Sequence, residues 1–109
     1  MTFDEYQKFS RGTAVYPEIG NNFVYPVLGL CGESGEVAEK IKKVLRDKFG
    51  KINKRDKIEI EKELGDVLWY LSNICSELSL SFDSVARKNL RKLLSRKKRN
   101  KLRGKGDNR

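Results

Sequence analysis

Apolar residues recur every three or four positions along residues 60–78 and mark one side of a long helix. At about 100° per residue they cover an arc about 120° wide. These residues are Ile60, Leu64, Val67, Leu68, Leu71, Ile74, Cys75 and Leu78. The chain shows no alternation of apolar and polar residues of the kind typical of half-buried strands, and no internal repeat. We therefore predict an all-α protein, a four-helix-type bundle whose core contains this stripe.

Start and stop signals place two helices in the first half of the chain. Thr2 begins a capping-box sequence, so a first helix is predicted to run to about Thr13. A second helix is predicted over about 23–49, with Asn22 as its cap and Gly50 at its end.

Two further helices are predicted in the second half. A cap at Asp56 begins a third helix that extends to about Leu80. Leu80 and Val85 flank Ser81 in the positions of a hydrophobic staple. A fourth helix is therefore predicted from Ser81 to about Arg96.

The net charge of +9 is concentrated at the C-terminal end. Residues 1–86 contain 12 Lys and Arg against 14 Asp and Glu, whereas residues 87–109 contain 12 basic residues and a single acid, Asp107. Such a segment is typical of a solvated arm or of one that binds phosphates. We divide the chain into a helical domain, 1–98, and a basic C-terminal tail, 99–109.

Length and composition exclude several classes of protein. A chain of 109 residues forms one domain, and one this small leaves much apolar surface uncovered, which favours self-association. The absence of histidine excludes an imidazole base and Cys2His2 zinc sites. Cys31 and Cys75 lack CxxC spacing and are interpreted as reduced core residues. No signal peptide or long apolar segment is present, so we expect a cytoplasmic protein without a membrane segment.

Four acidic residues border the apolar stripes of the second and third helices. Glu33 and Glu36 lie on one helix, and Glu63 and Asp66 lie on the other. On a helical wheel drawn for each helix with the first acid at 0°, the apolar residues fall at about 20–140° and the second acid falls near 300°. If the stripes pack together, the four carboxylates converge at the rim of the core. A site of carboxylate oxygens without His or Cys indicates Mg²⁺, with Mn²⁺ as the alternative.

An ordinary solvated acidic face explains the same spacing equally well. On such a face, each acid is balanced by a lysine four residues later. Glu33 and Glu63 have no basic partner on their own helices, which favours a metal. Two i,i+4 pairs are nevertheless present, Glu36 with Lys40 and Glu39 with Lys43.

Two glycines and two lysines lie on the acidic side of the second helix. Gly29 and Gly32 leave room for a ligand, and close packing of helices is the alternative reason for them. Lys40 and Lys43 lie on the arc of Glu33 and Glu36, where they are candidates for phosphate contacts or are simply solvated.

Residues 29–40 and 63–71 together resemble the MazG-like branch of the all-α nucleoside triphosphate pyrophosphohydrolases. The family signature is E-x2-E, a spacer, then E-x2-D. Residues 5–7, 89–96 and 104–109 also resemble small single-domain members. In this chain the signature is Glu33-x2-Glu36, 26 intervening residues and Glu63-x2-Asp66.

The resemblance implies Mg²⁺-dependent cleavage between the α and β phosphates of a nucleoside triphosphate, which releases a monophosphate and pyrophosphate. The four matched acids, Glu33, Glu36, Glu63 and Asp66, would be both the metal ligands and the catalytic carboxylates. It also implies a homodimer or tetramer in which neighbouring subunits contribute helices. The chain departs from some relatives at Gly32, where they have another glutamate.

Further residues are candidates for contacts with the substrate. Trp69 and Tyr70 are predicted to stack on the base or to lie at an interface. A polyanionic substrate near four carboxylates needs additional positive charge, and the fourth helix is its richest source. Lys92 and Arg96 are therefore predicted to contact the substrate, and Asn89, in the segment 89–96 that resembles the family, is a further candidate.

Two alternatives to an enzyme remain at this stage. One is a helical module without catalytic activity that binds nucleic acid through residues 87–109. The other is a purely structural helical dimer with a solvated acidic rim.

Overall fold

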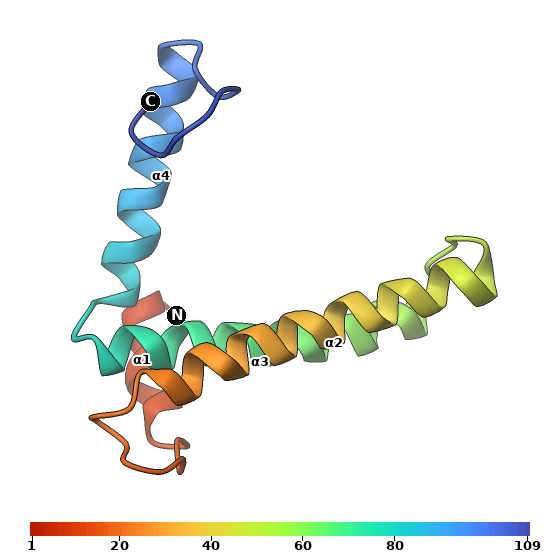
Figure 1. Cartoon of the computed structure of the whole chain (residues 1–109), viewed down its shortest axis with the longest axis horizontal. Helices are drawn as coiled ribbons and strands as arrows, with labels where there is room; N and C mark the ends of the chain where they lie inside the picture. The colour runs from red at the N-terminus through yellow and green to blue at the C-terminus, as the bar shows by residue number, and fades with distance from the viewer.

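The longest part of the structure is an antiparallel hairpin of two helices, α2 (Val24–Lys48) and α3 (Lys54–Glu77) (Figure 1). The computed structural model describes all 109 residues and contains two further helices, α1 (Phe3–Arg11) and α4 (Phe82–Lys98). No strand is present. The prediction of an all-α chain with four helices is confirmed.

Side-chain caps set the start of most of these helices. Thr2 accepts a hydrogen bond from the Glu5 amide at 3.0 Å, as predicted. The third helix begins earlier than predicted, because Asn53 is its cap and accepts from the Asp56 amide at 2.8 Å. The Asp56 carboxylate accepts in return from the Asn53 amide at 3.0 Å. Asp56 therefore completes a capping box and is not itself the cap.

The two ends of α2 differ in detail from the prediction. The side chain of Asn22 accepts from the Tyr25 amide at 3.0 Å and so supports the first turn. At the other end, Phe49 is already left-handed, with φ of 54°, and Gly50 follows with φ of 77°. The Gly50 amide donates to the Val44 carbonyl at 3.1 Å, which closes the helix one residue before the glycine.

Helix α1 joins the end of α3 to the start of α4. Ser10 and Ser72 are buried, and their hydroxyl oxygens lie 3.3 Å apart between α1 and α3. Gln7 donates to the Leu80 carbonyl and accepts from the Phe82 amide, both at 2.9 Å. These bonds satisfy backbone groups at the α3–α4 turn.

A buried acid that the sequence analysis did not single out holds the loop between α1 and α2. The Glu77 side chain is fully buried, pairs with Arg11, and accepts from the amides of Gly20 and Asn22. Burial alone raises the pKa of Glu77, but these donors outweigh it and hold the pKa below its ordinary value. Asn73 is also buried and accepts from Arg11 at 2.9 Å.

The apolar stripe of α3 is only partly covered within one chain, which corrects the expectation that all of it is core. Cys75 is buried, but Leu64, Leu71 and Leu78 are 52%, 38% and 48% exposed. These three leucines are seven residues apart and form one ridge along α3. α1 and α2 pack on α3, and no other helix covers this ridge. Cys31 is exposed as well, contrary to its interpretation as a core residue.

The molecule is open because α4 runs away from the hairpin (Figure 1). Its main contacts with other helices are with α1. The radius of gyration is 16.8 Å, against about 13 Å for a compact chain of this length. The accessible surface is 8412 Å², against about 6,200 Å² for a compact monomer of this mass. None of the helices has the length and apolar character needed to span a membrane.

Candidate metal centre between α2 and α3

Three of the four predicted acids meet between the two long helices. Glu33 of α2 lies beside Glu63 and Asp66 of α3, and one carboxylate oxygen from each lies within 4.8 Å of the other two. Glu33 and Glu63 are half-buried and Asp66 is exposed. The group therefore opens to solvent on one side, so that a ligand can reach it.

Glu36, the fourth acid, is not part of this group of three. It lies one turn further along α2 and is exposed. Its charge still acts on the group, because it contributes to the raised pKa of Glu33. Glu36 is thus close enough to influence the cluster without converging on the same point.

The electrostatics of the cluster favour a cation. Burial raises the pKa of Glu33, and the negative charges of Asp66, Glu63 and Glu36 raise it further. Three carboxylates in close proximity supply only oxygen donors, which Mg²⁺ and Mn²⁺ prefer. The residues present therefore fit a hard divalent cation. Such an ion would replace repulsion between the carboxylates with attraction.

A lysine from α2 reaches the cluster across the helix interface. Lys40 Nζ lies 3.4 Å from Glu63 Oε1, and both side chains are partly buried. The predicted Glu36–Lys40 pair is wrong, because Lys40 pairs with the opposite helix instead. The prediction for Glu39 is confirmed, since Lys43 lies 4.0 Å from it, although Lys42 is closer at 2.9 Å. Pairing rules within one helix do not reveal a partner on another helix.

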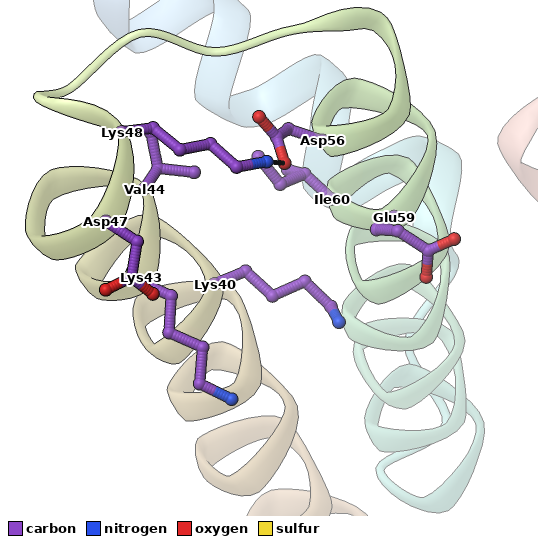
Figure 2. Close-up of a pocket in the computed structure, with 8 residues that line it drawn as sticks. All are labelled: Lys40, Lys43, Val44, Asp47, Lys48, Asp56, Glu59 and Ile60. Carbon is purple, nitrogen blue, oxygen red and sulfur yellow. Dashed lines mark hydrogen bonds and ion pairs between the residues drawn. The ribbon is translucent and has the colours of Figure 1, made fainter.

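A cavity of about 230 Å³ lies next to the cluster, towards the α2–α3 turn. Figure 2 shows Lys40 extending from α2 towards α3 across this space, and Lys48 paired with Asp56. The cavity is lined mainly by charged residues, which suits a polar ligand better than an apolar one. The lining residues are Lys40, Lys43, Val44, Asp47, Lys48, Asp56, Glu59 and Ile60.

The two glycines on the acidic side of α2 have different roles. A Cβ at Gly29 would overlap the ring of Tyr70, so this glycine allows close packing of α2 on α3. Nothing lies within 4 Å of a Cβ built on Gly32, which leaves open space there. Burial raises the pKa of Tyr70, with further contributions from Tyr25, Glu33 and Asp66. Tyr70 therefore lies beside the acids, at the end of the cluster away from Lys40.

Trp69 is engaged within the chain. Its indole Nε1 donates to the Thr13 hydroxyl at 2.8 Å, and its ring lies edge-on to Tyr16 and Tyr70. These contacts hold the indole between α3 and the loop that follows α1. The ring remains partly exposed.

The predicted substrate residues of α4 do not join the cluster within one chain. Asn89 is exposed, and Lys92 Nζ lies 2.7 Å from Asp107 Oδ1 in the C-terminal loop. Arg96 is 5% exposed and donates to the carbonyl and carboxylate oxygens of Asp107. Because α4 runs away from the hairpin, these side chains lie on a separate arm of the molecule (Figure 1).

Comparison with known proteins identifies related sequences. Residues 26–100 match the family model described as the MazG nucleotide pyrophosphohydrolase domain. The matched region contains all four acids of the signature and nearly all of α2, α3 and α4. The chain is also 42% identical over 114 residues to the "Gene 37 protein" of Mycobacterium phage L5, with both proteins covered in full. No solved structure matches the chain.

Proposed function

The chain belongs to the MazG nucleotide pyrophosphohydrolase domain family, and from this premise we propose that it hydrolyses nucleoside triphosphates between the α and β phosphates. The products are a nucleoside monophosphate and pyrophosphate, and the reaction depends on Mg²⁺. The observation that carries this proposal is the group of three carboxylates contributed by two helices.

The acids act as ligands and as acceptors of hydrogen bonds. Glu33, Glu63 and Asp66 would hold Mg²⁺, or Mn²⁺ in its place, with Glu36 available one turn away. A bound Mg²⁺ neutralises charge on the phosphates as the P–O bond breaks. Carboxylate oxygens of the same group accept hydrogen bonds from the attacking water and orient it. No histidine is needed for this chemistry.

The surroundings of the cluster suggest how a nucleotide lies in it. Lys40 and Lys43 line the cavity on one side, where they would contact the outer phosphates. Tyr70 forms the other side and, with Trp69 next to it, would contact the nucleoside. In this arrangement the triphosphate would cross the acids, so the bond to be cleaved would lie beside the residues that would hold the cation.

The cations of α4 would reach this site from another copy of the chain. Asn89, Lys92 and Arg96 lie on an arm that leaves its own hairpin, while the ridge on α3 remains uncovered. A homodimer, or a tetramer of dimers, would cover such a ridge and bring one subunit's arm near its neighbour's acids. Lys92 and Arg96 would then add charge that stabilises the polyanionic substrate, and the Asn89 amide would donate hydrogen bonds to it.

The two alternatives predicted from the sequence leave features of the carboxylate group unexplained. A nucleic-acid-binding module without catalytic activity leaves the carboxylates between α2 and α3 without a role. A structural dimer with a solvated rim does not account for the partly buried Glu33, because an uncompensated acid at that position opposes folding.

The test measures pyrophosphate release by variants in which an amide replaces one carboxylate. We expect Glu33→Gln and Asp66→Asn to reduce pyrophosphate release by about a hundredfold or more, because single electrostatic contacts to a transition state are worth that much. Glu36→Gln reports whether the fourth acid takes part. Glu61→Gln, an exposed acid on α3 outside the group, is the matched control.

Separate detection of orthophosphate and pyrophosphate identifies the bond that is cleaved. Wild-type turnover in Glu33→Gln and Asp66→Asn would contradict the assignment of the site. A nucleoside diphosphate with orthophosphate as products would contradict the assignment of the reaction.

A further inference from the structure

Most cations in the C-terminal part of the chain have no acidic partner. Residues 87–109 contain 12 Lys and Arg, and their single acid, Asp107, pairs with Lys92 and Arg96. Arg99 donates to the main-chain oxygen of Arg109 at 2.7 Å, and no basic residue of this segment other than Lys92 and Arg96 pairs with an acidic side chain. A dense group of unpaired cations attracts polyanions.

The helix separates its basic residues from its apolar ones. With Arg87 at 0° and about 100° per residue, seven cations fall between about 0° and 180°. Most apolar residues occupy about 220–340°, where Lys97 is the one cation, and Val85 is the one apolar residue inside the basic arc, at about 160°. The cations are Arg87, Lys88, Arg91, Lys92, Arg96, Lys98 and Arg99, and the apolar residues are Phe82, Ala86, Leu90, Leu93 and Leu94.

The C-terminal loop, residues 99–109, adds charge on the basic side of α4. Asp107 attaches the loop to Lys92 and Arg96, which lie within the basic arc. Arg109 donates to the carbonyls of Lys101, Leu102 and Gly106 and so closes the loop on itself. The loop also carries exposed cations, namely Lys101, Arg103 and Lys105.

We propose that the basic side of α4 and the C-terminal loop bind nucleic acid through its phosphodiester backbone. From Arg87 to Arg99 the basic arc extends about 18 Å, and one strand of B-DNA carries a phosphate about every 3.4 Å. The arc therefore spans several successive phosphates. The arm projects away from its own hairpin (Figure 1), so a long polyanion can reach the basic arc without crossing that hairpin. Lysine and arginine contacts to phosphates carry no base preference.

The same geometry disfavours an anionic membrane as the partner. A helix at a membrane surface buries its apolar arc in the lipid. On α4 the apolar arc is centred near 280°, almost opposite the centre of the basic arc near 90°. Membrane binding would turn the cations of the basic arc away from the headgroups, whereas a nucleic acid can contact them directly.

The test measures binding of the full chain to a 20-base-pair DNA and to a 20-nucleotide RNA by fluorescence anisotropy. Nucleotide and metal are left out, so the result does not depend on the proposed hydrolase activity. With at least four phosphate contacts, we expect affinity to fall at least about a hundredfold between 50 and 200 mM salt.

Two triple variants with the same change in charge locate the surface. We expect Arg87→Gln/Lys88→Gln/Arg91→Gln to weaken binding at least about tenfold at 50 mM salt, with a shallower dependence on salt. Lys51→Gln/Lys54→Gln/Lys57→Gln, at the turn of the hairpin, is expected to bind like the wild type. Circular dichroism checks that both variants fold.

Three outcomes would overturn the proposal. The first is no binding to either nucleic acid at 50 mM salt. The second is equal weakening in the two triple variants, which would show that only net charge matters. The third is binding to phosphatidylserine-containing vesicles in the absence of nucleic-acid binding.

Discussion

Glu33 has an environment unlike that of two other partly exposed acids on the same two helices, Glu39 and Glu59. Hydrogen bonds from lysines lower the pKa of Glu39 and of Glu59. The pKa of Glu33 is raised instead, by burial and by three neighbouring carboxylates. Protonation therefore stabilises the folded state at Glu33, and a cation competes with the proton for the same oxygens.

The first residue-scale prediction concerns pH. The pKa of Glu33 in the folded protein is above its ordinary value of 4.5. Protonated Glu33 therefore stabilises the folded state below pH 4.5, and this stabilisation is lost as the pH rises through the folded pKa. Cation binding requires the ionised form. We therefore expect the rise in Tm caused by Mg²⁺ to be smaller at pH 4.5, where a carboxyl with a raised pKa is mostly protonated, than at pH 7.5.

Thermal unfolding with and without Mg²⁺ at the two pH values measures this effect. Glu33→Gln is the control, because it removes the titrating group and most of the Mg²⁺ effect with it. A rise in Tm that is equal at both pH values in the wild type would show that Glu33 is not a ligand.

At the scale of elements, α2 can approach α3 closely because Gly29 leaves room for the ring of Tyr70. Tyr70 occupies the space that a side chain at Gly29 would need. Three residues along, Gly32 faces open space. Alanine substitutions at the two glycines therefore separate the effect of side-chain packing on stability from the effect of helix propensity.

We expect Gly29→Ala to destabilise the protein by about 1–3 kcal/mol, because overpacking forces the ring of Tyr70 or the helices apart. Gly32→Ala is expected to stabilise it by up to about 1 kcal/mol, because alanine favours a helix more than glycine does. Urea unfolding of both variants gives the two free energies. Equal effects in the two variants would mean that Tyr70 does not pack on Gly29.

At the scale of the whole molecule, the chain exposes more surface than a folded monomer of its mass. The excess over a compact monomer is about 2,200 Å² per chain, which is within the range buried by obligate subunit interfaces. The ridge of Leu64, Leu71 and Leu78 is part of this excess. The size of the exposed apolar surface, rather than any single contact, favours assembly.

We expect the purified protein to elute as a dimer or tetramer, measured by size-exclusion chromatography with light scattering. Leu64→Glu/Leu71→Glu is expected to shift the population towards the monomer, because charges cannot be buried in an apolar interface without a partner. Val15→Glu, at an exposed loop position, is the control. A monomeric wild type, or an assembly unaffected by the double substitution, would contradict this prediction.

Local rules explain the features of the fold that the residues alone predict correctly. Four helices, the caps at Thr2 and Ser81 and the all-α class follow from residues close together in the chain, because capping and helical periodicity act over one or two turns. The division of charge at residue 87 is likewise a property of the sequence. Convergence of Glu33, Glu63 and Asp66 was predictable because all three border apolar stripes that pack together.

Only the tertiary structure decided which side chains meet across elements. Lys40 pairs with Glu63 instead of Glu36, Tyr70 fills the space at Gly29, and Glu36 lies outside the group of three. These outcomes depend on how far each helix is rotated about its axis and how closely it approaches its neighbour, which spacing along one helix does not specify. The direction of α4 is decided in the same way, because its packing partner is α1, which is distant in sequence.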